Sequence, residues 1–260
     1  MNLYYRDLTK PINEDEQSAL SKQIEEEKES DKSKFGRVNN GIKFSHTDKN
    51  IRRFLWHYNS LFPNNYLWHL EFSRENLKNE KKLFNKELNK STKEEDIQRY
   101  IKENKKWVIP GSIFEEYNFG HHGKYLFPEQ QLGSEYKADY CLLGKNSDGY
   151  HIVLVEFENP SKPYMLKSSN TESEEVRKGL TQISDWERWL DSNRSYFLNS
   201  MGLTSKGINI PTYRFHYCLV VSRRNLMDND AKELRSHKIS KINNLNIITY
   251  DRLLDYIIKY

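Results

Sequence analysis

Runs of apolar residues with the character of β-strands occur four times in the last two thirds of the chain. Two of these runs flank a turn whose Asp148-Gly149 pair is typical of a β-hairpin. A third run is almost entirely apolar, which is typical of a strand in the interior of a sheet. The predicted strands cover residues 135–144, 150–160, 213–224 and 245–251. The pattern thus predicts one hairpin followed by two further strands.

Segments with the 3.6-residue period of an amphipathic helix lie before, between and after these strands. Leu180, Ile183 and Trp186 belong to the apolar stripe of the longest of them. The predicted helices lie within residues 91–111, 173–198, 227–241 and 252–260. Helices and strands that alternate in this way predict an α/β fold with a mixed central β-sheet flanked by helices.

The ends of the first of these helices are marked by residue type. Thr92 and Glu95 have the spacing of a capping box, so we expect the helix to start there. Pro110 and Gly111 lie beyond its expected end. Residues 114–128, which follow, have the composition of a loop with ordered aromatic side chains.

The first 90 residues do not continue this order. Residues 1–38 are polar, with helical spacing around Leu20 and Ile24, and predict a peripheral helix or a loose arm. Aromatic residues become frequent in 50–73, where short helices and strands are both compatible with the pattern. We therefore expect two domains: residues 1–90 as a helical or mixed N-terminal region with a regulatory or oligomerisation role, and the α/β domain in 91–260.

The composition predicts a hydrophobic core rich in aromatic side chains and argues against a membrane-spanning segment. Hydrophobic residues make up 36% of the 260 positions, and aromatic residues make up 13%, with 17 Tyr. A few large rings can fill a core that would otherwise need many aliphatic side chains. No apolar run approaches the roughly 20 residues that span a bilayer, and the N-terminus lacks the apolar stretch of a secretion signal. Cys141 and Cys218 lie in strand-like runs, as buried reduced thiols do. We expect a cytoplasmic protein without disulfides and without a membrane partner.

The charge balance alone does not indicate a polyanionic partner. The net charge is +4, from 41 basic and 37 acidic residues. Acidic residues are concentrated in 13–31, which leaves the remainder more basic. This distribution is compatible with a phosphate-binding face and equally with an ordinary solvated surface.

Two acidic residues at the end of an apolar strand are the main chemical signal. Glu156 and Glu158 point to the same side of the sheet because strand side chains alternate. Like charges on a half-buried face repel each other and lose solvation. The hairpin brings Asp139 close, and three carboxylates suit a hard cation such as Mg²⁺, which can activate water and neutralise a phosphodiester transition state. Alternatively, the acids face solvent or pair with Lys137 or Lys162.

The hairpin and four further segments resemble a known family. The pieces EYKADYCLL and VLVEFENP resemble the central hairpin of the PD-(D/E)XK nuclease superfamily, and more narrowly of the Shedu anti-phage nuclease domain. The other matching pieces, in chain order, are EEDIQRYIKENKKWVIPG, GLTQISDWERWL, CLVVSRRNLMDNDAKELR and NIITYDRLLDY. The resemblance covers about residues 91–260, and the first 90 residues carry no comparable signal.

The resemblance implies roles for five residues. Asp139 and Glu156 would ligate Mg²⁺ or Mn²⁺. Glu158 stands where the superfamily most often has lysine, so it would act as a general base or as a ligand of a second ion, or it marks lost activity. Gln182 would orient water or contact phosphate, unless it is an ordinary polar position of its helix. Glu95 would be the acid of the family's first helix, although its capping position already accounts for it.

The resemblance also implies an activity and partners. It implies a metal-dependent endonuclease that hydrolyses double-stranded phage DNA in anti-phage defence, and that assembles as a homo-oligomer, typically a tetramer. The alternative is a catalytically inactive module with the nuclease fold that binds nucleic acid or a protein partner.

Overall fold

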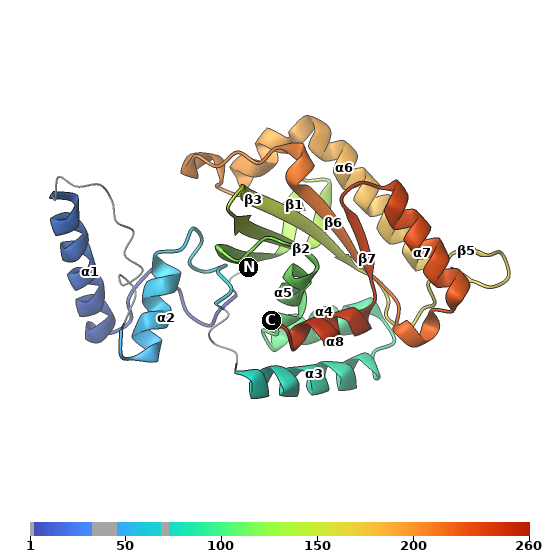
Figure 1. The fold of residues 1–260 in the computed structure, drawn as a ribbon, viewed down its shortest axis with the longest axis horizontal. Coiled ribbons are helices and arrows are strands. Elements are labelled where there is room, and N and C mark those ends of the chain that lie inside the picture. Colours follow the sequence, from blue (N-terminus) through green and yellow to red (C-terminus); the bar gives the residue numbers. More distant parts are fainter. Residues whose placement is uncertain (1–2, 33–45, 69–72) are drawn as a thin grey trace. The chain divides into compact units, whose positions relative to one another are not determined.

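The computed structural model describes residues 3–32, 46–68 and 73–260 (Figure 1). The chain divides into two compact units, Asn2–Trp68 and His69–Tyr260. Parts of the predicted N-terminal region, residues 1–2, 33–45 and 69–72, lie outside the described residues.

The first unit contains helices α1 (Glu14–Lys32) and α2 (Lys49–Tyr58). Asp48 caps α2, because its side chain accepts hydrogen bonds from the N–H groups of the first turn. A small core joins the two helices; it consists of Leu8, Leu20, Phe54 and Leu55. The helix predicted around Leu20 is therefore present, and the ambiguous aromatic segment begins as a helix.

The second unit is built on a mixed β-sheet, as the sequence predicts. In the described part of the chain the sheet has five strands in the order β1-β2-β3-β6-β7. The first three strands pair antiparallel, whereas β3, β6 and β7 are parallel to one another. The strands are β1 (Gly123–Leu132), β2 (Tyr136–Asn146), β3 (Gly149–Phe157), β6 (Phe215–Val220) and β7 (Leu245–Ile248). Strand β6 is interior, which confirms the expectation from its apolar sequence.

Two short strands lie between β3 and the long helix that follows it. They are β4 (Met165–Leu166) and β5 (Thr171–Glu172), and they pair with each other as a separate two-stranded sheet.

The edge strand β1 was missed by the sequence pattern. Part of the segment predicted as an aromatic loop, residues 114–128, belongs to β1, and its start forms the 3₁₀ helix η2 (Ser112–Glu116). Pro128 argues against a central strand because it cannot donate to the ladder, but an edge strand tolerates it. Because β1 lies at the edge of the sheet, its proline is compatible with pairing to β2.

Helices cover both faces of the sheet (Figure 1). Helix α6 packs on one face, against β1, β3 and β6, and α8 packs with α5 on the other. The α-helices are α3 (Arg74–Leu88), α4 (Glu94–Glu103), α5 (Val108–Gly111), α6 (Glu174–Ser200), α7 (Asn229–Lys241) and α8 (Tyr250–Ile257). The short 3₁₀ turns η3 (Thr204–Lys206), η4 (Thr212–Arg214) and η5 (Arg224–Leu226) complete the unit.

Helix α4 starts differently from the predicted capping box. Its N-cap is Lys93, and the carboxylate that reaches back is that of Asp96, which accepts hydrogen bonds from the N–H groups of Thr92 and Lys93 (3.3 Å each). The expected pairing of Thr92 with Glu95 was wrong, because the helix begins later and Asp96 takes the third helical position.

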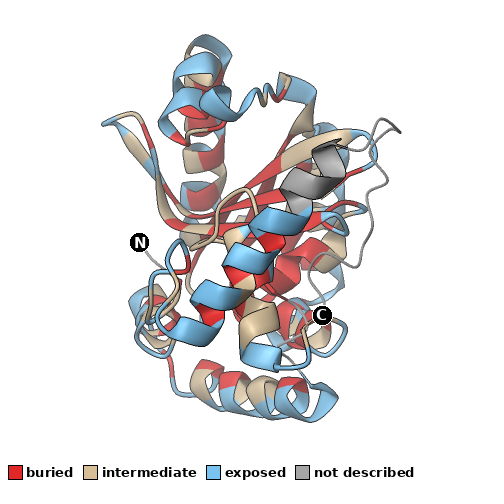
Figure 2. Cartoon of the chain, turned by 90° about the vertical axis from the view of Figure 1, so that its left-hand side faces the viewer, coloured by how far each residue is buried: buried red, intermediate tan, exposed pale blue. Residues whose placement is uncertain are grey.

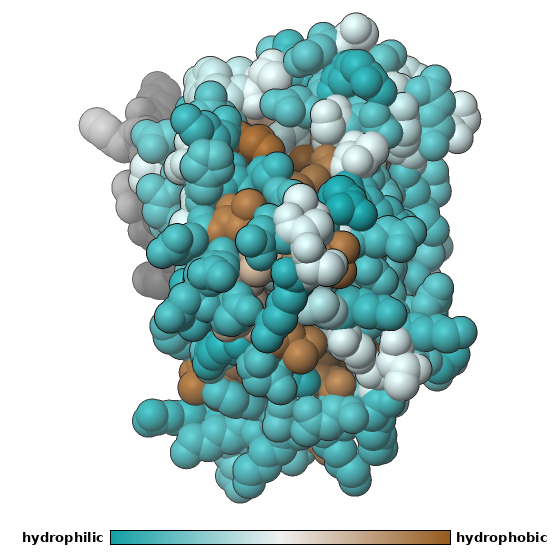
Figure 3. All heavy atoms as spheres, turned by 90° about the vertical axis from the view of Figure 1, so that its right-hand side faces the viewer, coloured by the Kyte–Doolittle hydropathy of each residue, from teal (hydrophilic) through white to brown (hydrophobic). Residues whose placement is uncertain are grey.

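Aromatic side chains fill much of the core, as the composition predicts. The fully buried large side chains include Trp186, Tyr140, Tyr250 and Phe157. The strands are buried along much of their length, whereas helices are buried mainly on their inner faces (Figure 2). Cys141 and Cys218 are buried free thiols. The face seen in Figure 3 is largely hydrophilic, with hydrophobic side chains in small separate groups. No helix in the described ranges has the length and hydropathy needed to cross a bilayer.

Helix α3 belongs by packing to the second unit. Its buried side chains Leu77, Phe84 and Leu88 lie on a helix that contacts α8 and α4. The division of function at residue 90 stays a prediction, whereas the packing of the chain changes at residue 68.

Candidate active site

The β2–β3 hairpin places Asp139 beside Glu156. Tyr140 and Val155 are the last pair of the antiparallel ladder at this end, and Asp139 and Glu156 each lie one residue beyond that pair. Residues opposite each other in such a ladder share a face of the sheet. The N–H of Phe157 donates to Asp139 Oδ2 at 2.8 Å, which fixes the Asp139 side chain at the end of the hairpin.

Glu158 follows directly after β3 and stays in line with the strand. Its N–H donates to the Val220 carbonyl at 2.8 Å, and the Tyr250 hydroxyl donates to the Glu158 carbonyl at 2.7 Å. These bonds keep the backbone extended, so Glu158 lies on the same face as Glu156. Both side chains are buried: Glu156 is 4% and Glu158 is 1% exposed. The structure thus brings together the three carboxylates that the sequence singles out.

Burial shifts the titration of all three carboxyl groups. Burial raises the pKa of Asp139 to about 7, although the hydrogen bond from Phe157 N–H opposes the shift. Burial, with the neighbouring charge of Asp139, raises the pKa of Glu156 to about 10. Burial raises the pKa of Glu158 to about 7, against the opposing charge of Lys178. Each group is therefore destabilised as an anion and favours a nearby cation.

A fourth carboxylate comes from helix α4, and it is Glu94 rather than Glu95. Burial raises the pKa of Glu94, while Lys178 opposes the shift, and a hydrogen bond links Glu94 to Glu158. The charge of Glu94 in turn raises the pKa of Asp139. Glu95 is exposed on the next position of the helix. The family resemblance had implied Glu95, the neighbouring residue, as the acid of this helix.

The cation beside this cluster is Lys178 of helix α6. Its Nζ lies 3.2 Å from Glu158 Oε2 and 3.7 Å from Glu94 Oε2. Partial burial lowers the pKa of Lys178, but the charges of Glu158 and Glu94 outweigh it and leave the pKa raised. Lys137, named above as a candidate partner of the glutamates, instead pairs with Glu129 at 3.3 Å.

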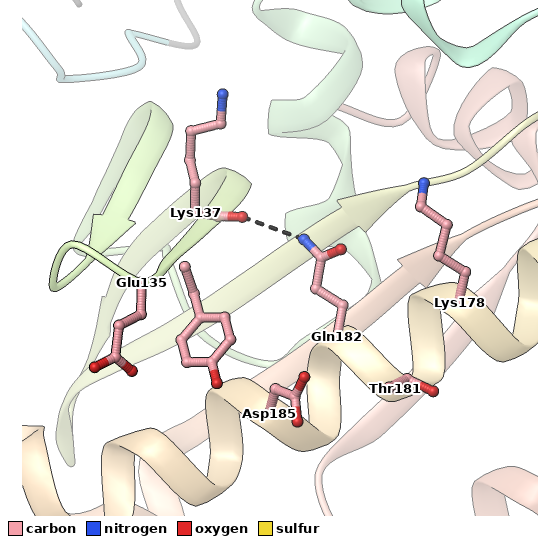
Figure 4. A pocket seen from close by; sticks show the side chains of 7 residues that line it. Glu135, Lys137, Lys178, Thr181, Gln182 and Asp185 are labelled. Carbon is pink, nitrogen blue, oxygen red and sulfur yellow. Dashed lines mark hydrogen bonds between the residues drawn. The ribbon is translucent and has the colours of Figure 1, made fainter.

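Gln182 lies on the same side of α6 as Lys178 and lines an open pocket (Figure 4). Its amide donates to the Lys137 carbonyl at 3.3 Å, so it is anchored to strand β2. The pocket has a volume of about 550 Å³ and is lined by Glu135, Tyr136, Lys137, Lys178, Thr181, Gln182 and Asp185. Lys178 thus joins the carboxylate cluster to the pocket.

The cluster has the donors that a hard cation needs, although they are not arranged as a finished metal site. Glu156 Oε2 and Glu158 Oε1 are buried and have no hydrogen-bond partner among the described residues. Buried carboxylate oxygens without partners fit an oxygen-binding ion such as Mg²⁺ or Mn²⁺. Across residues 3–32, 46–68 and 73–260, no group of three or more His, Cys, Asp or Glu side chains is placed ready to hold a metal ion.

Sequence reasoning missed Glu94 and Lys178, although helical spacing contained a signal for each. Glu94 precedes the buried Ile97 by three residues and the buried Ile101 by seven, which places it on the inner stripe of α4. Lys178 precedes Gln182 by four residues, so any face of α6 that brings Gln182 to the site brings Lys178 too.

Comparisons with known proteins identify a family. Residues 91–254 match the family model described as the C-terminal part of the Shedu protein SduA. No curated protein matches the sequence. Among solved structures, the restriction endonuclease FokI bound to DNA matches with 14% identity and a TM-score of 0.34, over 87% of this chain and 33% of that chain. The chain therefore spans about a third of the length of the FokI chain.

Proposed function

Because the chain belongs to the family of the Shedu protein SduA C-terminal region, we propose that it is a metal-dependent endonuclease. It hydrolyses phosphodiester bonds of double-stranded phage DNA in the cytoplasm, as part of anti-phage defence. The observation that carries the proposal is the carboxylate cluster at the end of the β2–β3 hairpin, with two buried oxygens that lack a partner among the described residues. A cluster of this kind is costly to bury unless a cation completes it.

The residues of the cluster have distinct roles in this proposal. Asp139 and Glu156 would hold Mg²⁺ or Mn²⁺, because both lie one residue beyond the last ladder pair of the hairpin and their charges interact. The ion would supply Lewis-acid activation of water and neutralise charge on the phosphate. Glu158 would accept a proton or serve as a further ligand. Gln182 would orient water or contact phosphate from the pocket wall. Glu94 takes the place that the sequence gave to Glu95.

Plasmid cleavage tests the proposal. Supercoiled plasmid is incubated with Mg²⁺ or Mn²⁺ and with the wild type, Asp139→Asn or Glu156→Gln, both close in shape to the native side chains. We expect nicked or linear product from the wild type and none from either variant. Equal products from all three proteins, or no product from the wild type with either metal, would contradict the proposal.

A second candidate function is a binding module without catalysis. The ion pair between Lys178 and Glu158 favours it, because an internal cation neutralises part of the cluster. Such a module binds DNA or a partner protein without binding divalent ions. Calorimetric titration with Mn²⁺ separates the two functions: heat of binding that Glu156→Gln abolishes supports the nuclease.

We also propose that the chain assembles as a homo-oligomer, with the tetramer as the expected form, and that residues 1–90 regulate or assemble it. Sedimentation velocity of the full chain gives the mass of the assembly. A monomer across the micromolar range would contradict this part of the proposal.

A further inference from the structure

Lys178 reaches from helix α6 to two carboxylates on different elements. Its ammonium lies 3.2 Å from Glu158, at the end of β3, and 3.7 Å from Glu94, at the start of α4. The Glu158 carboxylate is buried, with its side chain 2% exposed, whereas the Lys178 side chain is 60% exposed. The ammonium therefore stands at the boundary between the buried acids and the open pocket that Lys178 also lines.

A glycine next to the lysine allows this contact. A Cβ at Gly179 would stand 2.5 Å from Leu219 Cδ1 and 3.2 Å from Glu158 Cγ. A side chain there would force α6 away from the sheet, so the absence of one lets the helix pack tightly against the strand ends. Glycine in a helix interior costs about 1 kcal/mol relative to alanine. The close approach that places Lys178 over Glu158 offsets this cost.

Two other lysines whose charges reach Asp139, Lys102 and Lys137, form their ion pairs with Glu129. Lys102 Nζ and Lys137 Nζ lie 2.9 Å and 3.3 Å from the same oxygen of Glu129. Within the described residues, Lys178 is the lysine that forms ion pairs with Glu158 and Glu94. These pairs leave Glu156 Oε2 and Glu158 Oε1 without a partner there.

We propose that Lys178 is a tethered cation of the site. Its ammonium is the counter-ion of Glu94 and Glu158 and takes the place of a second divalent ion. One divalent ion is then bound, by Asp139 and Glu156. The inference rests on the proposed function and deepens it, because it assigns Glu158 to a lysine instead of a second metal. A buried carboxylate that loses its paired cation must take another one or a proton. Removing the ammonium should thus open the site to a second ion.

Calorimetric titration of the full chain with Mn²⁺ tests this inference without relying on cleavage. We expect one ion per chain for the wild type and for Lys178→Arg, which keeps the charge, and two ions for Lys178→Met. The double variant Glu158→Gln with Lys178→Met removes both members of the pair and should return to one ion. Lys137→Met is the matched control, because Lys137 lines the same pocket but pairs with Glu129, and it should match the wild type.

The same number of ions in the wild type and Lys178→Met, whatever that number is, would overturn the inference, as would two ions for the double variant. Thermal unfolding without metal checks that each variant is folded. If Lys178→Met is not folded, Lys178→Arg still tests the assignment, because the inference requires Lys178→Arg to bind one ion. If the wild type fails to cleave DNA but the Lys178→Met variant binds one more ion than the wild type, the proposed function is contradicted and this inference is supported. If the wild type cleaves DNA but Lys178→Met binds the same number of ions, the proposed function is supported and this inference is contradicted.

Discussion

Buried carboxylates at the end of the β2–β3 hairpin repel one another and lose solvation. Glu156 is strongly perturbed: burial and the charges of Asp139 and Glu158 raise its pKa to about 10. In the unfolded chain its pKa returns to the ordinary value near 4.5. The folded state therefore binds a proton that the unfolded state releases, and this favours folding at low pH. That contribution is fully present below pH 4.5 and is lost as the pH rises toward 10.

We therefore predict that Glu156→Gln stabilises the metal-free protein at pH 7.5. At this pH the native carboxyl must take up a proton on folding to be buried, whereas the amide is neutral in both states at a position that is 4% exposed, so the free energy of unfolding should rise by about 1–3 kcal/mol. Urea unfolding with EDTA measures it, and the gain over the wild type should grow between pH 5 and pH 9. A variant of equal or lower stability across this range would show that the native carboxylate is not under strain.

Glu94 and Glu95 provide a matched pair of acids one residue apart. Glu94 is hydrogen-bonded to Glu158 and influences Asp139, whereas Glu95 is exposed. Groups that orient the ligands of a metal change activity by about 10- to 100-fold when they are removed. We predict a loss of this size in the plasmid cleavage rate for Glu94→Gln and none for Glu95→Gln. Equal rates for the two variants would show that α4 contributes no acid to the site.

At the scale of elements, the site depends on how closely helix α6 packs on the sheet. Gly179 faces Leu219 of β6 and the Glu158 side chain with no room for a Cβ. Two effects of a substitution to alanine oppose each other here. Alanine is favoured over glycine in a helix by about 1 kcal/mol, whereas overpacking a well-filled core costs about 1–3 kcal/mol.

We predict that overpacking dominates, because the contact would be at 2.5 Å. Gly179→Ala should lower the free energy of unfolding by about 1 kcal/mol or more, as measured by urea unfolding. Ser184→Ala is the control: Ser184 is exposed on the same helix, and its replacement should be neutral or slightly stabilising. If Gly179→Ala is stabilising as well, the helix does not need glycine for its approach to the sheet.

At the scale of the whole molecule, helix α3 decides where the second unit starts. Phe84 is fully buried and its ring stacks on that of Tyr100 in α4, with 6.5 Å between centroids. Lys106 and Glu80 form an ion pair at 2.7 Å. Arg223, which precedes η5, also donates to Asn85 and Asn89. Helix α3 is therefore part of the packed α/β unit, although it lies before the segment that matches the family.

We predict that a chain that starts at residue 69 is more stable than one that starts at residue 91. Removing α3 exposes the surfaces that cover Leu77, Phe84 and Leu88, and three such side chains contribute roughly 5 kcal/mol or more on burial. The urea midpoint of each truncated chain measures the difference. Equal midpoints would mean that the unit begins at residue 91, where the sequence places the domain boundary.

Local sequence determined the hairpin and the three acids on its end. The tight turn between the paired residues Asn146 and Gly149 fixes the register of the two strands. The two-residue period of a strand then puts Asp139, Glu156 and Glu158 on one face. Alternating helices and strands likewise determined the fold class. These predictions rest on residues close in sequence, where backbone geometry leaves few alternatives.

Only the tertiary structure decided which other side chains reach the acids. Lys178 is more than thirty positions from Asp139, and it reaches Glu158 because Gly179 lets α6 approach the sheet. Glu94 lies against Glu158 while Glu95 is exposed, because the packing of α4 fixes its rotation about its axis and one residue turns a helical side chain by about 100°. The approach and rotation of a helix depend on the surfaces it packs against, and those surfaces are distant in sequence.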